Sequence, residues 1–344
     1  MPPGTPLAGG RYVVGRVLGH GGFGITYEAA NPVLGRTVAV KEFFPDGSVR
    51  QATQLVPPTR LGAGGFHEAR QRFIEEARTL ARFDHPGIVR VFDVFEENGT
   101  AYLVMEFLRG ETLGKRIERL GRLGEREVQD IAFRVADALS VVHKAGLLHR
   151  DIKPDNIFLT DDGRVVLIDF GAARDFVQGQ TVAHTRMVTP GYAPLEQYAT
   201  SAKLGPYTDL YALGATLYHA LTGTLPPTAT DRASGVPLPP LPRNVSPRLA
   251  RLINRSLGMR VADRPGSVEE LLRELNRPAA APSPSLPDLP DPPPPPDPPA
   301  FPARPRRRPR PQGGEVDPLA GGALAQPLVF LDLPGLGVLA RLEK

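Results

Sequence analysis

The sequence predicts an α+β fold in two lobes: a small antiparallel sheet carrying one main helix, then a larger, mostly helical lobe. Up to about residue 105, apolar residues come in short β-branched and aromatic runs that are typical of strands. From about residue 109 they recur at helical spacing instead. From Pro278 to Pro311 about half of the residues are proline, so this part is expected to lie outside the folded core.

The first lobe, about residues 11–105, is expected to contain five strands and one helix. Asn98-Gly99 separates the last two strands and is a hairpin-turn signal. The helix is expected at residues 67–83, because Phe73, Ala77 and Leu80 are spaced as one apolar stripe. The expected strands are residues 12–18, 25–29, 37–41, 88–95 and 101–106.

The second lobe, about residues 109–276, is expected to be helical with one hairpin. Apolar residues share one helical face over residues 128–142, and a second apolar helix, residues 210–221, ends at Gly223. Residues 157–159 and 165–168 flank the turn at residues 161–163, which predicts the hairpin. A helix at residues 267–275 closes the domain, which is expected to span residues 11–276.

The remaining segments are not expected to fold into this domain. Residues 1–10 are rich in proline and glycine and are expected to be flexible. Residues 278–317 are rich in proline and arginine and are expected to form a disordered linker. Residues 318–344 form an apolar tail, but Asp332, Pro327 and Pro334 interrupt the run of about 20 apolar residues that a membrane span needs. A loose tail or a docking peptide is therefore expected, and membrane anchoring by residues 318–340 is the disfavoured alternative.

Composition excludes several chemistries. The 344 residues include no cysteine, so disulfides, thiolate catalysis and cysteine-bearing zinc sites are excluded. The formal net charge is only +4 and the main basic cluster, residues 304–310, lies in the proline-rich segment, so no nucleic-acid partner is expected. Residues 1–10 lack the basic start and apolar core of a secretory signal, which predicts a cytoplasmic location for the domain.

A glycine-rich stretch lies between the first two expected strands. Glycines let backbone amides approach phosphate oxygens closely, and a strand on each side is the context of a phosphate-binding flap. An ordinary glycine-rich hairpin is the alternative. The stretch consists of Gly19, His20, Gly21, Gly22, Phe23 and Gly24.

A lysine on the third expected strand is the first candidate catalytic residue. Lys41 follows Ala39-Val40, and an ammonium group held by a strand can neutralise the phosphates of a nucleotide. Its expected partner is a glutamate of the helix. Glu76 falls on the inward stripe, whereas Glu75 points about 100° away on a helix of 3.6 residues per turn. Glu76 is therefore the predicted partner, and Glu75 is expected to be solvated.

Two further strings supply the groups that phosphoryl transfer requires. The reaction needs a carboxylate that orients and deprotonates the acceptor hydroxyl, and oxygen ligands for Mg²⁺ ions that bridge the phosphates. Asp151 is the candidate base, and Asn156 and Asp169 are the candidate metal ligands. The alternative, that Asp151 is only an acid on a surface loop, is disfavoured by the neighbouring motif.

The strings at residues 149–156 (His-Arg-Asp-Ile-Lys-Pro-Asp-Asn) and 169–171 (Asp-Phe-Gly) resemble the catalytic loop and magnesium motif of Hanks-type, or eukaryotic-like, serine/threonine protein kinases. With the glycines and Lys41, the resemblance covers about residues 11–275. It implies the two-lobed protein kinase fold, with ATP and Mg²⁺, or Mn²⁺, in the cleft. It also implies that Lys153 contacts the transferred phosphoryl group and marks a Ser/Thr acceptor.

The resemblance also implies an adenine site, with Met105 at the gatekeeper position. Thr26 replaces the usual valine over the adenine, and Thr112 stands where many relatives have an acidic ribose contact. Both departures concern nucleotide affinity rather than the type of reaction. The other implied contacts are the backbone of Glu106 to Leu108 at the hinge, and Leu18, Ala39 and Leu159 around the ring.

Residues 189–196 resemble the substrate-facing loop of the family, although a leucine separates the proline from the closing glutamate. The resemblance implies a buried ion pair between Glu196 and Arg264, and implies that Asp209 braces the catalytic loop. Arg150 would receive the phosphate of a modified activation loop. The candidate phosphosites are Thr181 and Thr185, while Thr189 is expected to face Asp151 and Lys153.

The expected function is an ATP-dependent serine/threonine protein kinase that autophosphorylates its activation loop, with self-association in that step. The string at residues 41–45, the insertion after it and residues 191–198 resemble a bacterial subgroup of these kinases, which indicates a bacterial signalling enzyme. Two alternatives are a pseudokinase that acts as a binding scaffold and a small-molecule kinase on the same fold. The protein substrate and the activating signal are not predicted.

Overall fold

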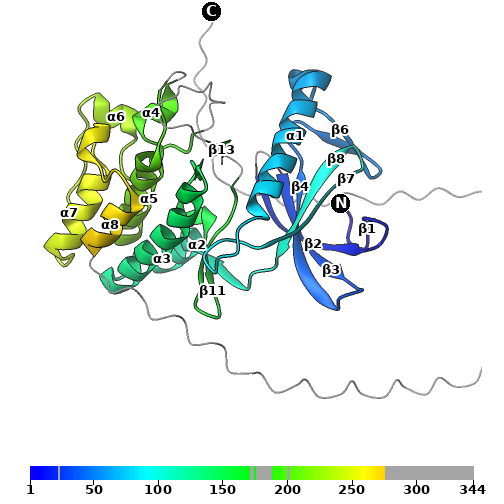
Figure 1. Ribbon diagram of the computed structural model, residues 1–344, viewed down its shortest axis with the longest axis horizontal. Coiled ribbons are helices and arrows are strands. Elements are labelled where there is room, and N and C mark those ends of the chain that lie inside the picture. The colour runs from blue at the N-terminus through cyan, green and yellow to red at the C-terminus, as the bar shows by residue number, and fades with distance from the viewer. Residues whose placement is uncertain (22–23, 171–173, 176–187, 200–201, 276–344) are drawn as a thin grey trace, which may run out of the picture. The chain divides into compact units, whose positions relative to one another are not determined.

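The computed structural model describes residues 1–21, 24–170, 174–175, 188–199 and 202–275 (Figure 1). The chain divides into two compact units, Met1–Ser283 and Pro284–Lys344, and all described residues belong to the first. The predicted linker at 278–317 and the tail at 318–344 lie outside the described residues, as do the candidates Gly22, Phe23, Thr181 and Thr185.

An antiparallel sheet with the strand order β1-β2-β3-β4-β8-β7 forms the first lobe. All five predicted strands are present, at Tyr12–Gly21 (β2), Gly24–Asn31 (β3), Arg36–Phe43 (β4), Val91–Glu97 (β7) and Thr100–Glu106 (β8). Side chains alternate across the sheet, so Tyr102 and Val104 enter one apolar cluster while Ala101 and Leu103 enter another. The sheet is therefore buried on both faces.

Residues 1–10, which we expected to be flexible, instead extend this sheet. Strand β1 (Pro6–Leu7) pairs with the start of β2, and the side chain of Leu7 is fully buried. The amide of Val14 donates to the carbonyl of Thr5 at 2.9 Å, and the amide of Ala8 donates to Oε2 of Glu97 at 2.7 Å. The apolar Leu7 gains burial against the sheet, a tertiary contact that the Pro- and Gly-rich composition did not reveal.

Helix α1 (Gly62–Leu80) packs against β7 and β8 (Figure 1). It starts five residues before the predicted helix, and its buried stripe includes Phe73 and Leu80 as expected. The insertion between β4 and α1 folds into a hairpin of β5 (Val49–Gln51) and β6 (Gln54–Val56), followed by a 3₁₀ turn at Thr59–Leu61. The hairpin was not predicted from the sequence.

Helices packed around one large apolar core form the second lobe. The predicted helices are observed as α3 (Glu125–Lys144), α5 (Pro206–Thr222) and α8 (Val268–Leu275). Helix α5 has Pro206 in its first turn and ends at Gly223 with φ 73°, a left-handed conformation that glycine adopts without strain. The additional helices are α2 (Leu113–Leu120), α4 (Leu195–Tyr198), α6 (Ala229–Ala233) and α7 (Pro247–Ser256).

Short strands line the second lobe where it meets the first. The predicted hairpin is observed as β11 (Ile157–Thr160) and β12 (Val165–Leu167), with β9 (Gly110–Thr112) on its other side. Strand β10 (Leu147–Leu148) pairs with β13 (Arg174–Asp175). The amide of Val89 donates to the carbonyl of Leu167 at 3.1 Å, and the amide of Leu167 donates to the carbonyl of Gly87 at 2.8 Å. These bonds attach the segment after α1 to the hairpin that precedes Asp169.

Within the described residues, every helix is too short or too polar to meet the requirements for crossing a lipid bilayer.

Candidate active site

Lys41 and Asp169 come from different lobes and meet in one site. Lys41 lies on β4 opposite Thr26 of β3 and Leu103 of β8. Its Nζ is 2.5 Å from Oδ1 of Asp169, and only 15% of the lysine side chain is exposed. Burial by itself lowers the pKa of Lys41, but the charges of Asp169, Glu76 and other carboxylates outweigh it and raise the pKa above its usual value. Lys41 is therefore a fixed cation at this site.

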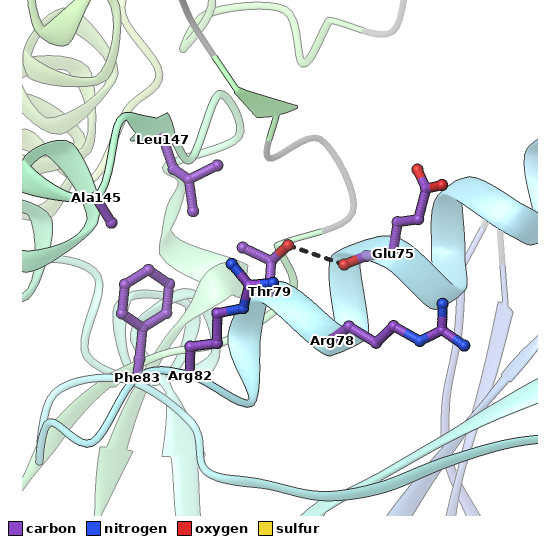
Figure 2. A pocket seen from close by; sticks show the side chains of 7 residues that line it. All are labelled: Glu75, Arg78, Thr79, Arg82, Phe83, Ala145 and Leu147. Atoms are coloured by element: carbon purple, nitrogen blue, oxygen red, sulfur yellow. Dashed lines mark hydrogen bonds between the residues drawn. The ribbon is translucent and has the colours of Figure 1, made fainter.

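The two glutamates of α1 differ in position. Glu76 is half-buried, and its charge is one of those that raise the pKa of Lys41. The direct ion pair of Lys41 is with Asp169, so Glu76 contributes here as a neighbouring charge. Glu75 is exposed and lines a separate hollow of about 340 Å³ between α1 and Leu147 (Figure 2). Glu76 is thus the more buried of the two and Glu75 the more exposed, and the role of Glu76 as the partner of Lys41 stays a prediction.

Asp151 lies at the centre of a cluster of polar side chains. Its carboxylate accepts hydrogen bonds from Nζ of Lys153 at 2.7 Å, from Oγ1 of Thr189 at 2.8 Å and from Nδ2 of Asn156 at 2.9 Å. Lys153 Nζ is also 3.2 Å from Thr189 Oγ1. A carboxylate, a cation and a hydroxyl thus lie within hydrogen-bond distance of one another, which is the geometry required for general-base chemistry on a hydroxyl.

Asp209 fixes the backbone of the loop that carries Asp151. Its carboxylate accepts from the amide of His149 at 2.9 Å, from the amide of Arg150 at 2.7 Å and from Nε2 of His143 at 2.8 Å. Full burial alone would raise the pKa of Asp209, but these donors and the nearby histidines hold it below its usual value. Arg150 has φ 66°, an uncommon conformation for a residue other than glycine, and the bonds to Asp209 fix it.

Replacing Asp209 with asparagine is expected to lower the free energy of unfolding by about 2 kcal/mol near neutral pH, because an amide cannot accept from three donors. The carboxylate stabilises the fold fully above the pKa of an unfolded aspartate, about 3.9, and loses that effect as the pH falls through the lower folded pKa. The difference between variant and wild type should therefore shrink below about pH 4. Urea unfolding at several pH values tests this, and a constant difference down to pH 3 would contradict it.

Asn156 and Asp169 provide the oxygen atoms that a hard cation requires. Nδ2 of Asn156 donates to the carbonyl and the carboxylate of Asp151, which leaves its Oδ1 as an acceptor. Asp169 has φ 59° and a carboxylate that is 44% exposed. The described residues contain no group of three or more His, Cys, Asp or Glu side chains that could hold a metal. One carboxylate and one amide oxygen suit Mg²⁺, which usually completes its shell with phosphate and water oxygens.

The described glycines of the stretch at residues 19–24 differ in their surroundings. A Cβ atom on Gly24 would lie 2.5 Å from the carbonyl oxygen of Glu42, so close pairing of β3 with β4 requires glycine there. A Cβ on Gly19 or Gly21 would meet no atom within 4 Å. Packing with neighbouring atoms therefore does not require glycine at these two positions.

The segment that ends at Glu196 is fixed to the second lobe. Nη1 of Arg264 lies 2.5 Å from Oε1 of Glu196, both side chains are buried, and Thr208 also donates to the same carboxylate oxygen at 3.3 Å. Nε2 of Gln197 donates to the carbonyl of Arg150 at 2.8 Å. The segment around Glu196 and the loop at residues 149–156 are thus joined directly.

Comparison with known proteins identifies the family. Residues 12–275 match the model of the protein kinase domain. The chain belongs to the protein kinase family. It is 39% identical over 266 residues to serine/threonine-protein kinase PknA of Mycobacterium tuberculosis, covering 72% of this chain and 56% of that protein. It is 35% identical to a PknA of Nostoc, covering 78% of this chain and 47% of that protein.

A solved structure supports the same assignment. The structure titled PpkA-294 apo form superposes with a TM-score of 0.71 at 33% sequence identity, and the match covers 80% of this chain and 99% of that one. The predicted two-lobed kinase fold and the bacterial subgroup are therefore confirmed. The chain spans about half the length of the curated kinases that it matches. Protein kinases use ATP and a divalent metal ion.

The predicted apolar contacts of the adenine ring require one correction. Ala39 and Met105 form a buried cluster to which Leu108 and Phe158 are packed. Leu159, the residue we predicted, packs against the core of the second lobe instead. Neighbouring residues of a strand point to opposite faces, so only one of the two can pack beside Ala39 and Met105, and that residue is Phe158. The one-residue register of this short strand was not evident from its sequence.

The remaining nucleotide candidates are partly exposed or have other partners in the structure. Leu18 is 37% exposed on β2, and Thr26 is half-buried on β3. Thr112 caps helix α2 by accepting from the amide of Lys115 at 3.3 Å, so its hydroxyl has a structural partner. Glu106, at the predicted hinge, forms a 2.7 Å ion pair with Arg164 in the turn after β11. This link across the lobes was missed, because it joins residues 58 positions apart.

Proposed function

We propose that the protein is a serine/threonine protein kinase that transfers the γ-phosphoryl group of ATP to hydroxyl groups of protein substrates. The observation that carries the proposal is the cluster of Asp151, Lys153 and Thr189, with Asn156 beside it and the Lys41–Asp169 pair close enough for the charge of Asp151 to act on Lys41. The names of the related kinases and the match to the protein kinase domain support the same activity.

The chain's own residues would act as follows. Asp151 would orient the acceptor hydroxyl and accept its proton, because its carboxylate already accepts from the hydroxyl of Thr189. Lys153, 2.7 Å from that carboxylate, would stabilise charge on the transferred group, and Lys41 would hold the α- and β-phosphates. Asn156 and Asp169 would hold Mg²⁺, or Mn²⁺ in its place, and the bound metal would neutralise charge on the phosphates.

The adenine ring would lie against Ala39, Met105 and Phe158, with the hinge backbone at Glu106 to Leu108 as its hydrogen-bonding edge. The phosphates would then lie under the glycine flap near Lys41. Neither alternative function has an observation in its favour: Lys41, Asp151, Asn156 and Asp169 are all present, and the contacts Lys41–Asp169 and Asn156–Asp151 argue against a degraded, scaffold-type site.

The test is a transfer assay with radiolabelled ATP, Mg²⁺ and a generic basic protein, followed by phosphoamino-acid analysis. Label should enter phosphoserine and phosphothreonine, and EDTA should abolish transfer because the phosphates lose their metal. A parallel reaction with Mn²⁺ instead of Mg²⁺ tests whether Mn²⁺ also supports transfer. Protein that binds ATP but transfers no label to any protein acceptor would overturn the proposal.

Regulation by autophosphorylation of Thr181 or Thr185, in trans between two copies, is part of this proposal. Arg150 lies in the catalytic loop next to Asp151, and a phosphothreonine adds about −1.5 to −2 charge that a guanidinium can pair with. Phosphopeptide mapping of active protein should find one or both threonines modified. Fully active protein in which neither threonine is phosphorylated would show that this regulation is wrong.

A further inference from the structure

Glu42 is a buried carboxylate that the proposed chemistry does not use. It follows Lys41 on β4, and its side chain is fully buried. Nη2 of Arg50 lies 2.6 Å from both of its carboxylate oxygens. The hydroxyls of Tyr27 and Tyr102 donate to it at 2.9 and 3.2 Å. Burial raises the pKa of both tyrosines, and the charge of Glu42 raises it further, so both hydroxyls stay protonated.

Arg50 is fixed in place by the hairpin that carries it. Its Nη1 donates to the carbonyl of Thr53 at 2.9 Å, which closes the turn between β5 and β6. Its guanidinium lies over the ring of Phe44, 5.1 Å from the ring centre. Only 15% of the Arg50 side chain is exposed, so water screens its pair with Glu42 poorly. The ion pair is thus a rigid link between β4 and the insertion.

The same hairpin contacts the helix that carries Glu76. Leu55 of β6 is buried in one cluster with Phe66 and Phe73 of α1 and with Phe43 of β4. The ring of Phe43 lies 5.5 Å from that of Phe66 and 5.6 Å from that of Phe73. The amide of Leu55 donates to the carbonyl of Asn98 in the turn between β7 and β8 at 2.9 Å. The hairpin therefore touches both elements that carry charge to the nucleotide site.

We propose that Arg50 is a positioning residue: through its ion pair with Glu42 it fixes β4 against the hairpin and so places Lys41 relative to Glu76 of α1. Consecutive residues of a strand point to opposite faces, so holding Glu42 on one face sets the direction of Lys41 on the other. This inference rests on the proposed kinase function, because Lys41 matters only if it holds nucleotide phosphates. The ordinary alternative is that the pair stabilises the fold and nothing more.

Two variants separate positioning from stability. Arg50→Met removes the cation and leaves a buried carboxylate. The double variant Glu42→Gln with Arg50→Met removes both charges. It leaves no unpaired carboxylate in the core, but it still lacks the ion pair that links β4 to the hairpin. Arg72→Ala is the matched control, because Arg72 pairs with Glu68 at 3.2 Å on the exposed side of the same region. Melting temperature, kcat, and KM for MgATP and for a basic protein substrate are measured for each, below the lowest melting temperature.

The proposal expects Arg50→Met to raise KM for MgATP by about tenfold while KM for the protein substrate stays within about twofold, since only nucleotide binding depends on Lys41. The double variant should regain the wild-type melting temperature but keep the raised KM for MgATP. Loss of folded protein alone would lower the apparent kcat and leave both KM values unchanged. The Arg72→Ala control should match wild type in every measurement.

A double variant with wild-type KM for MgATP would overturn the proposal, since it would show that charge balance alone is needed. If Arg50→Met does not fold, the uncharged double variant still decides the question. Titration with a fluorescent ATP analogue measures the same effect without catalysis, and weaker binding in the double variant than in wild type is the expected result. Wild-type protein that transfers no phosphate would defeat the proposed function, whereas this titration tests Arg50 independently of transfer.

Discussion

Replacing Asp151 with asparagine should reduce kcat by about 10²- to 10⁴-fold, the range associated with loss of a positioned general base. Asparagine keeps the size of the side chain and can still accept from Asn156 and Lys153, but it cannot take the proton of the acceptor hydroxyl. KM for MgATP should change little, because Asp151 contacts the acceptor side of the site. Steady-state kinetics with radiolabelled ATP measures both constants.

The matched control for this variant is Asp162→Asn. Asp162 is an exposed acid in the turn after β11, where it pairs with Arg164 at 3.0 Å, outside the catalytic cluster. The Asp162→Asn variant should leave kcat unchanged. If Asp151→Asn retained more than about a tenth of wild-type kcat, the general-base role would be wrong, and if wild type and variant were equally inactive, the kinase proposal itself would fail.

Breaking the ion pair between Arg264 and Glu196 should cause the largest loss of stability. The side chain of Arg264 is fully buried, it contacts Glu196 through two nitrogens at 2.5 and 3.2 Å, and it also donates to the carbonyl of Gly258 at 2.7 Å. Arg264→Met should therefore lower the free energy of unfolding by about 3–5 kcal/mol, because it strands a buried carboxylate. Urea unfolding followed by circular dichroism measures this.

Two further variants make that result interpretable. Glu196→Gln with Arg264→Met removes both charges and should recover much of the lost stability, because most of the penalty comes from the unpaired charge. Arg134→Ala breaks an exposed pair with Asp130 on α3 and should cost no more than about 0.5 kcal/mol. A loss below about 1 kcal/mol in Arg264→Met would show that Glu196 finds another partner or is not needed as a charge.

Local patterns in the sequence predicted the main elements well where one residue spacing decides the structure. The apolar stripe through Phe73 and Leu80 predicted α1 and separated Glu76 from Glu75, because the period of a helix is fixed. Asn98-Gly99 predicted the turn between β7 and β8, where both residues have positive φ. The short motifs gave the candidate residues Lys41, Asp151, Asn156 and Asp169, because their chemistry requires particular side chains.

Other features depend on contacts between distant residues and could not be predicted. Leu7 joins the sheet because a buried site for it exists beside β2, and composition alone indicated a flexible segment. Phe158, not Leu159, faces Ala39, since the register of a short strand is set by its neighbours in the sheet. Arg50 reaches Glu42 only because the insertion folds into a hairpin, for which no strong turn signal was recognised.

The sequence by itself predicted the family, through motifs that resemble those of protein kinases, the order of the lobes and the candidate reacting groups, because these are carried by residue type and spacing along the chain. Only the tertiary structure decided which charges meet: Lys41 with Asp169, Glu42 with Arg50, and Glu106 with Arg164. Such pairs form where packing brings two side chains from distant parts of the chain together, and that condition cannot be read from a linear sequence.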